Sequence, residues 1–527
     1  MKSIFKKSFS VFLSLMIVFS LIAVAFPSAS ALDVYTDIPT VYVEGQGYGL
    51  GIKQEDGSYD QVYGIQIPEG YIEAAVEENI DVFLLAVVTQ DWDDFCDVLY
   101  EKFTPLYAEI KLDEKGQPAN GSTVMWEWSK ETLNTNTVNG GYEFDQFRYH
   151  YDWRLSPYQI AEGLHEYIKA VCEVTGHDKV ALAGRCLGTC VTMAYMEMYG
   201  GEYIADHIMY ASALKGVDFC SQAFCGNLYL ESDGVERFFY DIDLGLDATM
   251  TDFVQGFLTV ANKTEGLDLA LLAVNNVLPQ IKYNLYPRLL KDTYASFPSY
   301  WAMVEEEYYD EAKRVVFDGM DMDAYADFID LIDSYHYNVQ IPAEDIITYQ
   351  KEELGIDYYN ITKYGMQSVP VTENTDTLSD RYVDVTGASL GATTGTISTN
   401  LSDDYIKIAA INGTDNYISL DKKIDASTCL YPDQTWFIKN LNHKDFPDVV
   451  NLLMAEMVNN EGYSVTSDEN YPQFLSYDVD TDTISALAEE NGNVNDDKWG
   501  ATIWQALRKI IAVIIKLLMD SVITMPI

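Results

Sequence analysis

Short apolar runs and amphipathic segments alternate in the first half of the chain. The runs at 147–153, 179–183 (KVALA) and 207–211 (HIMYA) have the length and composition of buried strands, as does TVYVEG at 40–45. Between the later runs, apolar side chains recur at helical spacing after Ser156-Pro157, an N-cap followed by a proline at the first helical position, and again from residue 187. This alternation predicts an α/β fold, with a mostly parallel central sheet and helices on both faces.

The pattern changes twice after residue 214. Residues 215–345 have helical periodicity, many aromatic and acidic residues and no clear strand, which predicts a helical cap inserted over the carboxyl edge of the sheet. Strand-like segments return over 346–460. We therefore expect one core in two halves, 32–214 and 346–460, followed by an acidic tail over 461–498.

The two ends of the chain have patterns of their own. Residues 1–31 contain three lysines, an apolar run and Ala29-Ser30-Ala31, the arrangement of a secretory signal peptide with its cleavage site, although an uncleaved membrane anchor has a similar pattern. Residues 499–527 contain an amphipathic helix with a very wide apolar face. This helix either docks on the core or attaches the protein to a membrane or cell surface. We expect a secreted, extracytoplasmic protein.

The composition is that of a globular and strongly acidic protein. Its 527 residues are 48% hydrophobic and 13% aromatic, and the net charge is -49. Such a charge excludes nucleic acid as a partner and repels anionic lipid. The seven cysteines are an odd number, so at least one thiol is free or bridges two chains, and Cys220 and Cys225 are close enough for a small-loop disulfide.

The strongest chemical motif is Gly184-Arg185-Cys186-Leu187-Gly188, between the KVALA strand and the next helix. A strand, a G-x-nucleophile-x-G turn and a helix form the nucleophile elbow, where small residues allow a strained turn and close backbone contacts. The helix N-terminus favours negative charge at Cys186 and so lowers its thiol pKa, and Arg185 adds a cation nearby. A buried structural cysteine in a glycine-rich turn is the alternative. Cys190, one helical turn later, is interpreted as a small buried residue.

Two segments resemble a known family. YDWRLSP at 151–157 and KVALAGRCLGTC at 179–190 are similar to the lecithin:cholesterol acyltransferase branch of the α/β-hydrolases, most clearly over 145–215 and more weakly over 40–50 and 375–445. The resemblance implies an α/β-hydrolase fold with esterase, lipase or acyltransferase activity. That family has serine at the elbow where this chain has cysteine, although dienelactone-hydrolase-like enzymes of the same fold use a thiol.

The acid and the base of a catalytic triad follow the nucleophile in this fold. Ser379-Asp380-Arg381-Tyr382-Val383 is similar to the segment that carries the acid in the resembled family, which implies Asp380, with Asp376 and Asp384 as alternatives. Of the six histidines only His443 follows Asp380, directly after the TWFIK strand, where the fold places its base. The sequence therefore predicts a Cys186–Asp380–His443 triad.

Backbone N–H groups complete the predicted site. The fold takes one oxyanion-hole donor from the residue after the nucleophile and one from an earlier glycine-rich loop, here Leu187 and Gln46, although Glu44-Gly45 replaces the usual His-Gly pair. No cofactor or metal is predicted. The acidic run beginning at Asp478 has Thr483 where a calcium loop requires glycine.

Together these features predict hydrolysis or acyl transfer on apolar carboxylic esters through a thioester. The partner would then be a small-molecule or lipid ester substrate. The cysteine and the missing His-Gly pair leave two alternatives: a catalytically inactive binding protein on the same fold, and a thioesterase or peptidase.

Overall fold

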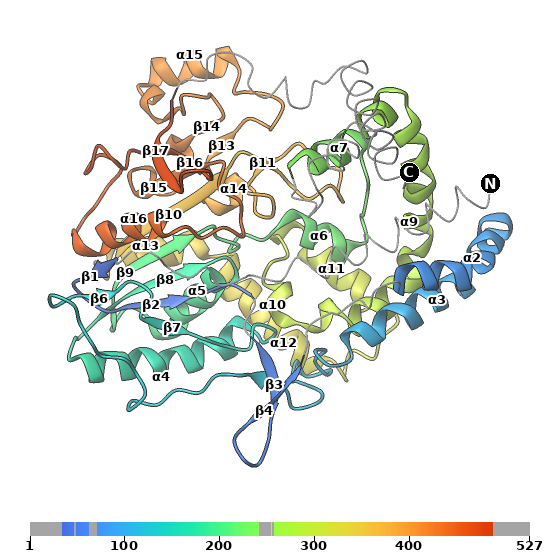
Figure 1. The fold of residues 1–527 in the computed structure, drawn as a ribbon, viewed down its shortest axis with the longest axis horizontal. Helices are drawn as coiled ribbons and strands as arrows, with labels where there is room; N and C mark the ends of the chain where they lie inside the picture. The colour runs from blue at the N-terminus through green and yellow to red at the C-terminus, as the bar shows by residue number, and fades with distance from the viewer. Residues whose placement is uncertain (1–33, 47–48, 63–70, 242–254, 256–257, 489–527) are drawn as a thin grey trace, which may run out of the picture.

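The computed structural model describes residues 34–488, apart from 47–48, 63–70, 242–254 and 256–257. At its centre is an eight-stranded sheet with the order β17-β16-β15-β10-β9-β8-β2-β7 (Figure 1). Neighbouring strands are parallel except β16 and β17. The predicted mostly parallel sheet is confirmed. Its strands are β2 (Thr40–Val43), β7 (Phe147–Tyr149), β8 (Val180–Arg185), β9 (Ile204–Tyr210), β10 (Asp357–Tyr364), β15 (Thr435–Lys439), β16 (Phe474–Asp478) and β17 (Thr483–Ala486).

Helices cover both faces of this sheet, and its central strands are therefore buried on both sides. The helices α4 (Pro157–Thr175), α5 (Leu187–Tyr199) and α13 (Ala343–Glu352) belong to the core cluster on one face. Helix α16 (Asp448–Asn459) packs on the other face. Helix α4 begins as the sequence predicts: Ser156 is its N-cap, forms a capping box with Gln159, and is followed by proline.

Between β9 and β10 the described residues form helices and contain no strand. These elements lie mainly beside the sheet and not on its faces (Figure 1). They are α6 (Asp218–Cys225), α7 (Ser232–Asp241), α9 (Gly266–Lys291), η2 (Tyr294–Ser296), α10 (Pro298–Trp301), η3 (Glu306–Tyr308), α11 (Tyr309–Val316), α12 (Ala326–Tyr335) and η4 (His336–Gln340), followed by the start of α13.

A second insertion separates β2 from β7, and the sequence did not reveal it. Its helix α3 packs against α9, where Arg288 pairs with Asp97 at 2.6 Å and Asn284 donates a hydrogen bond to Asp93 at 2.8 Å. The two insertions, far apart in sequence, therefore form one helical region. The elements of the second insertion are β3 (Leu50–Lys53), β4 (Tyr59–Val62), α2 (Tyr71–Thr89), α3 (Asp93–Phe103), η1 (Thr104–Tyr107) and β5 (Thr123–Val124).

The prediction of an acidic tail over 461–498 is wrong for its central part. Strands β16 and β17 extend the main sheet, and the acidic residues from Asp478 to Asp482 form the turn between them. These strands lie at the sheet edge and β17 is mostly exposed, so they need few apolar residues and give little strand signal.

The remaining elements are short. They are β1 (Tyr35–Thr36), β6 (Tyr142–Glu143), β11 (Met366–Gln367), β12 (Leu378–Ser379), α14 (Val385–Ala388), β13 (Thr393–Thr394), α15 (Asp403–Asn412), η5 (Asp415–Tyr417), β14 (Ile424–Asp425), η6 (Ala426–Thr428) and η7 (Pro432–Gln434).

The predicted signal peptide and C-terminal amphipathic helix lie outside the described residues. Within the described part of the chain, no helix has the length and apolar character needed to cross a membrane. All seven cysteines are free. Cys220 and Cys225 lie on the single helix α6, so the suggested small-loop disulfide is not formed.

Candidate active site

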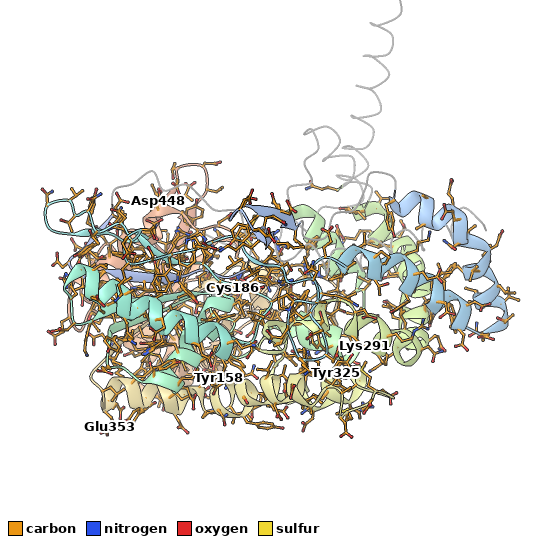
Figure 2. All side chains as sticks on the ribbon, turned by 90° about the horizontal axis from the view of Figure 1, so that it is seen from below. Tyr158, Cys186, Lys291, Tyr325, Glu353 and Asp448 are labelled. Atoms are coloured by element: carbon orange, nitrogen blue, oxygen red, sulfur yellow. The ribbon has the colours of Figure 1, made fainter. Side chains whose placement is uncertain are left out.

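Cys186 occupies a strained turn between β8 and α5. Its backbone has φ 52° and ψ −125°, a conformation that residues other than glycine rarely adopt. The ladder with β9 holds this turn, because the Cys186 N–H donates to the Tyr210 carbonyl at 3.1 Å. The residue lies near the middle of the molecule, between the sheet and the helical insertions (Figure 2). Strain of this kind persists only where the surrounding structure imposes it.

The two glycines of the motif are required by close backbone contacts. A Cβ on Gly188 would lie 2.1 Å from the Val43 carbonyl oxygen, and one on Gly184 would lie 2.9 Å from the Gly188 carbonyl oxygen. Helix α5 thus starts directly against the ends of β2 and β8. A strand, a strained turn with two glycines and a helix, on a mostly parallel sheet, form the elbow that is typical of one known architecture. The chain has the α/β-hydrolase fold.

In this α/β-hydrolase fold, Asp380 and His443 meet although 63 residues separate them. Asp380 follows β12 and His443 follows β15. The His443 Nδ1 lies 2.6 Å from Asp380 Oδ2, and the His443 backbone N–H donates to the Asp380 carbonyl at 2.9 Å. The other Asp380 oxygen accepts hydrogen bonds from the N–H groups of Val383 and Tyr382, at 2.9 and 3.1 Å. The carboxylate is therefore fixed and aimed at the imidazole.

The imidazole also interacts with Cys186. Burial opposes ionisation of the thiol, but His443 and its hydrogen bond, together with Arg185 and the Leu187 N–H, outweigh burial and lower the pKa of Cys186. Burial likewise opposes protonation of His443, yet the charges of Asp380 and Cys186 raise the pKa of His443. Shifts in these directions favour a thiolate–imidazolium pair at neutral pH.

The alternative acids have other roles. Asp384 caps α14 by accepting the Gly387 N–H at 2.7 Å, and Asp376 accepts the Ser398 N–H at 3.1 Å. The buried His207 contacts Thr192 and Gln350, in keeping with a core histidine. Of the three candidate acids, only Asp380 contacts His443.

The segments that carry the two predicted oxyanion donors lie close to the thiol. Leu187 follows Cys186 at the start of α5, and its N–H helps to lower the pKa of Cys186. A Cβ on Gly45 would lie 3.6 Å from Cys186 Sγ, so the loop that leads to Gln46 passes directly beside the sulfur. The Gln46 side-chain oxygen accepts a hydrogen bond from Tyr300 at 3.4 Å. Glu44, which stands where the fold usually has histidine, pairs with Arg185 at 2.8 Å.

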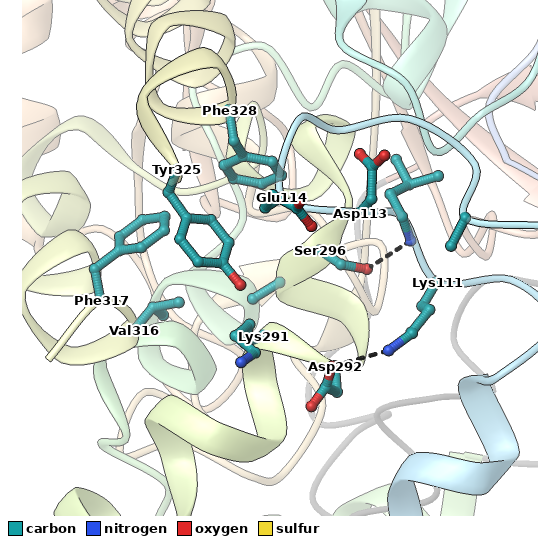
Figure 3. A pocket seen from close by; sticks show the side chains of 13 residues that line it. Lys111, Asp113, Glu114, Lys291, Asp292, Ser296, Val316, Phe317, Tyr325 and Phe328 are labelled. Carbon is teal, nitrogen blue, oxygen red and sulfur yellow. Dashed lines mark hydrogen bonds and ion pairs between the residues drawn. The ribbon is translucent and has the colours of Figure 1, made fainter. Parts of the chain in front are cut away.

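Two hollows lie in different parts of the molecule. One of about 450 Å³ is lined by Lys215, three glutamates of the segment 305–307, and Asp384, four residues after Asp380. The other, of about 280 Å³, lies between the 111–119 loop and the helical insertion and includes none of the three predicted triad residues (Figure 3). The lining of the first hollow does not include Cys186, Asp380 or His443 either, and it approaches the site only through Asp384.

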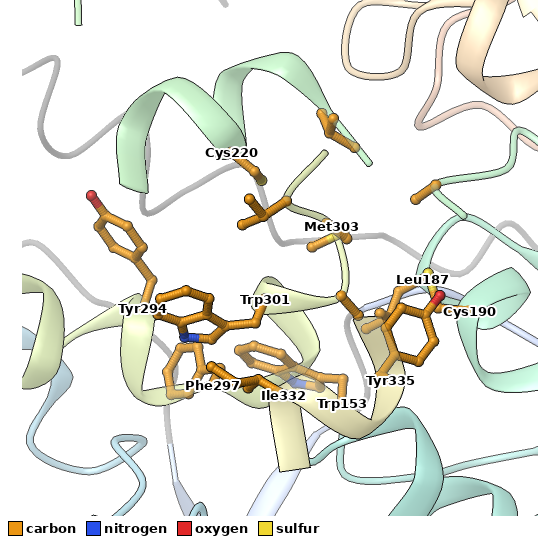
Figure 4. Close-up of a cluster of buried hydrophobic side chains, with 14 of the residues drawn as sticks. Trp153, Leu187, Cys190, Cys220, Tyr294, Phe297, Trp301, Met303, Ile332 and Tyr335 are labelled. Atoms are coloured by element: carbon orange, nitrogen blue, oxygen red, sulfur yellow. The ribbon is translucent and has the colours of Figure 1, made fainter. Parts of the chain in front are cut away.

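Apolar side chains surround the elbow on the side of the helical insertion. Trp153, Leu187, Met303 and Cys220 belong to one buried cluster, and Cys186 packs against it (Figure 4). Tyr300, also packed on this cluster, stacks on Trp153 with ring centroids 6.1 Å apart. No local sequence pattern singles out Tyr300, because its place beside Gln46 depends on how the insertion folds back.

Comparisons with known proteins are sparse. No family model and no curated protein matches the sequence. Among solved structures, a crystal structure of a Tle4–Tli4 complex aligns over 91% of this chain and 99% of that chain, with 11% identity and a TM-score of 0.28.

The sequence also missed Lys363 at the end of β10. Its ammonium donates hydrogen bonds to the backbone carbonyls of Asn442, His443 and Asp445, at 3.1, 3.0 and 2.8 Å. A lysine in a strand that is buried from its second residue onward was the available signal, because lysine is rarely buried without a partner.

Proposed function

We propose that this protein is an acyl-transferring enzyme that attacks apolar carboxylic esters with the thiolate of Cys186. The observation that supports this best is the 2.6 Å contact between His443 Nδ1 and Asp380, together with the effect of the same imidazole in lowering the pKa of a cysteine in a strained strand–helix turn. These three residues come from separate segments, and a purely structural cysteine needs no such partners.

In the acylation half-reaction, the Cys186 thiolate attacks the ester carbonyl carbon. A C–S bond forms, and the carbonyl electron pair moves onto oxygen, where the N–H groups of Leu187 and Gln46 stabilise the negative charge. When the tetrahedral intermediate collapses, the C–O bond to the alcohol breaks. The His443 imidazolium gives the leaving oxygen its proton, which leaves a neutral imidazole and a thioester.

In the second half-reaction, water or an acceptor alcohol attacks the thioester. His443 removes the proton of the attacking oxygen, and the C–S bond breaks when this second intermediate collapses. The products are the acid, or a new ester, and the regenerated thiolate–imidazolium pair. Asp380 keeps the His443 imidazole in the same tautomer throughout, because the Asp380 carboxylate accepts the hydrogen bond from Nδ1–H.

Two further features support an apolar acyl group. Cys186 packs against a large buried apolar cluster that includes Trp153 and, from the helical insertion, Met303. The sequence motifs also resemble the lecithin:cholesterol acyltransferase branch. We infer that residues 215–345 act as a cap that contacts the acyl chain, and that the protein acts outside the cytoplasm.

The decisive experiment detects the acyl-enzyme. The full chain would be incubated with p-nitrophenyl esters of increasing acyl length, quenched in acid, and analysed by peptide mass spectrometry. We expect a hydroxylamine-sensitive acyl adduct on Cys186 that is absent in Cys186→Ala. Cys172→Ala, which removes a buried thiol outside the site, should keep the adduct.

Parallel reactions with thioesters and amides decide between an esterase and a thioesterase or peptidase. If no substrate class acylates Cys186, the fold carries an inactive binding protein and the proposal is wrong.

A further inference from the structure

Two buried cations hold the loop that carries His443. Lys363 donates to three carbonyls of this loop, and Arg185 Nη2 donates to the His443 carbonyl at 2.7 Å. The His443 carbonyl therefore accepts from both an ammonium and a guanidinium. Lys363 is 1% exposed and Arg185 4%, so water screens neither charge effectively.

This arrangement costs free energy, because two like charges are buried close together. Glu44 offsets Arg185 through a 2.8 Å ion pair, and Glu44 also accepts from Arg148 at 3.3 Å. Among the described residues, no carboxylate lies within ion-pair distance of Lys363.

Other groups around Lys363 offset its charge only in part. Burial lowers the pKa of Lys363 most, and Arg185 lowers it further, whereas Asp380, Asp445 and Glu44 act in the opposite direction. The Tyr210 ring adds a cation–π contact with Lys363, 4.3 Å from the ring centroid. A loop that only needed its carbonyls satisfied could use neutral donors, so the costly pair of cations suggests a second role.

We propose that Lys363 and Arg185 are positioning residues that fix the His443 backbone and hold the imidazole between Asp380 and Cys186. The charge of Arg185 also favours the thiolate. This inference rests on the proposed function. It assigns a task to the arginine of the G-R-C-L-G motif: Arg185 acts on the elbow cysteine partly through the histidine loop.

The loop is thus fixed from two sides. Asp380 holds the imidazole at 2.6 Å and the His443 N–H at 2.9 Å, and the two cations hold the carbonyl of the same residue. Release of the carbonyl would let the imidazole shift relative to the sulfur. Misplacement of a catalytic group by about 1 Å costs on the order of 100-fold in rate.

The test measures iodoacetamide alkylation of Cys186 in the full chain from pH 5 to pH 10 by peptide mass spectrometry. In Lys363→Met the acid limb of the profile should move to higher pH. At pH values below the thiol pKa, each pH unit of that shift lowers the alkylation rate about tenfold. Arg185→Met should act in the same direction, and Arg185→Lys, which keeps the charge, should restore part of the loss.

A matched control and a double-mutant cycle separate positioning from general damage. Lys439→Met also removes a buried lysine of the sheet, one that pairs with Asp421 at 2.9 Å, and it should leave the profile unchanged. In a His443→Gln background, Lys363→Met should slow alkylation no further, because its effect acts through the imidazole.

The outcomes separate the two proposals. If wild-type Cys186 reacts no faster than the buried cysteines, the proposed function fails. If it reacts quickly but Lys363→Met has the wild-type profile, or slows the reaction equally in the His443→Gln background, only the positioning role is wrong. Lys363→Gln, which keeps a donor, replaces the methionine variant if that variant does not fold. If neither folds, the same cycle with Arg185→Met decides: the positioning role requires Arg185→Met to slow alkylation less in the His443→Gln background than in the wild type, and an equal slowing in both overturns it.

Discussion

Asp380→Asn is the substitution that tests the candidate site most directly. The change keeps the shape of the side chain and removes only its charge. Asp380 Oδ1 accepts the N–H groups of Val383 and Tyr382, while Oδ2 faces His443 Nδ1 at 2.6 Å. An asparagine would turn its carbonyl toward the two N–H groups, because only an acceptor fits there. Its NH₂ group would then face Nδ1.

An NH₂ group at that place makes Nδ1 an acceptor and leaves the imidazole proton on Nε2, which is the wrong tautomer for a base. The variant also loses the largest interaction that raises the pKa of His443, so the imidazolium no longer stabilises the Cys186 thiolate. Both effects act on the same step. We expect kcat to fall on the order of 10⁴-fold, about 5 kcal/mol of transition-state stabilisation.

The assay is ester turnover in wild type and variant, with the melting temperature as a check on folding. Asp376→Asn is the matched control, since it neutralises a nearby carboxylate that contacts Ser398 instead of His443. The control should retain wild-type turnover. If Asp380→Asn retains kcat within about threefold while folded, Asp380 does not orient the base and the reasoning is refuted.

Three further predictions follow from the geometry and the pKa directions. The rate of Cys186 alkylation should reach half its maximum below pH 8.5, the ordinary pKa of a thiol. Turnover should decline above about pH 9, where His443 loses its proton. An alkylation midpoint at or above pH 8.5 would contradict the ion pair. Gly188→Ala should abolish folding or lower the melting temperature sharply, because its Cβ would lie 2.1 Å from the Val43 carbonyl; an unchanged melting curve would show that the elbow is not tight. Burial, with Asp218 and Asp384, raises the pKa of Glu305 to about 8, so the native state binds an extra proton between about pH 4.3 and 8 and loses stability as pH rises through that window. Glu305→Gln should therefore raise the melting temperature at pH 9 but not at pH 4, and an equal effect at both values would contradict this.

The parts of the fold that sequence predicts best are those governed by local patterns. The strand, elbow and helix around Cys186 follow from apolar periodicity and two glycines, and α4 follows from Ser156-Pro157. Asp380 could be named because residues 379–383 resemble the acid segment of a known family, and His443 because the fold fixes the chain order of acid and base. In the structure these two residues lie in contact.

Other features depend on contacts that no local pattern encodes. Strands β16 and β17 are short and lie at the sheet edge, so the pairing of β16 with β15, and of β17 with β16, supplies the order that their sequences do not. Tyr300 reaches the Gln46 loop across 254 residues, and Lys363 reaches the His443 loop across 80. Side-chain direction at that range is set by tertiary packing.

The pairing of α3 with α9 has a consequence for engineering and for evolution. Asp97 and Arg288 belong to segments inserted at different points of the α/β core, and so do Lys111 and Asp292, paired at 3.0 Å. The helical region is therefore not a cassette with a single entry and exit. A chimaera that exchanges only the segment between β9 and β10 would leave α3 against a foreign surface. The helical region can be transplanted only when both insertions move together.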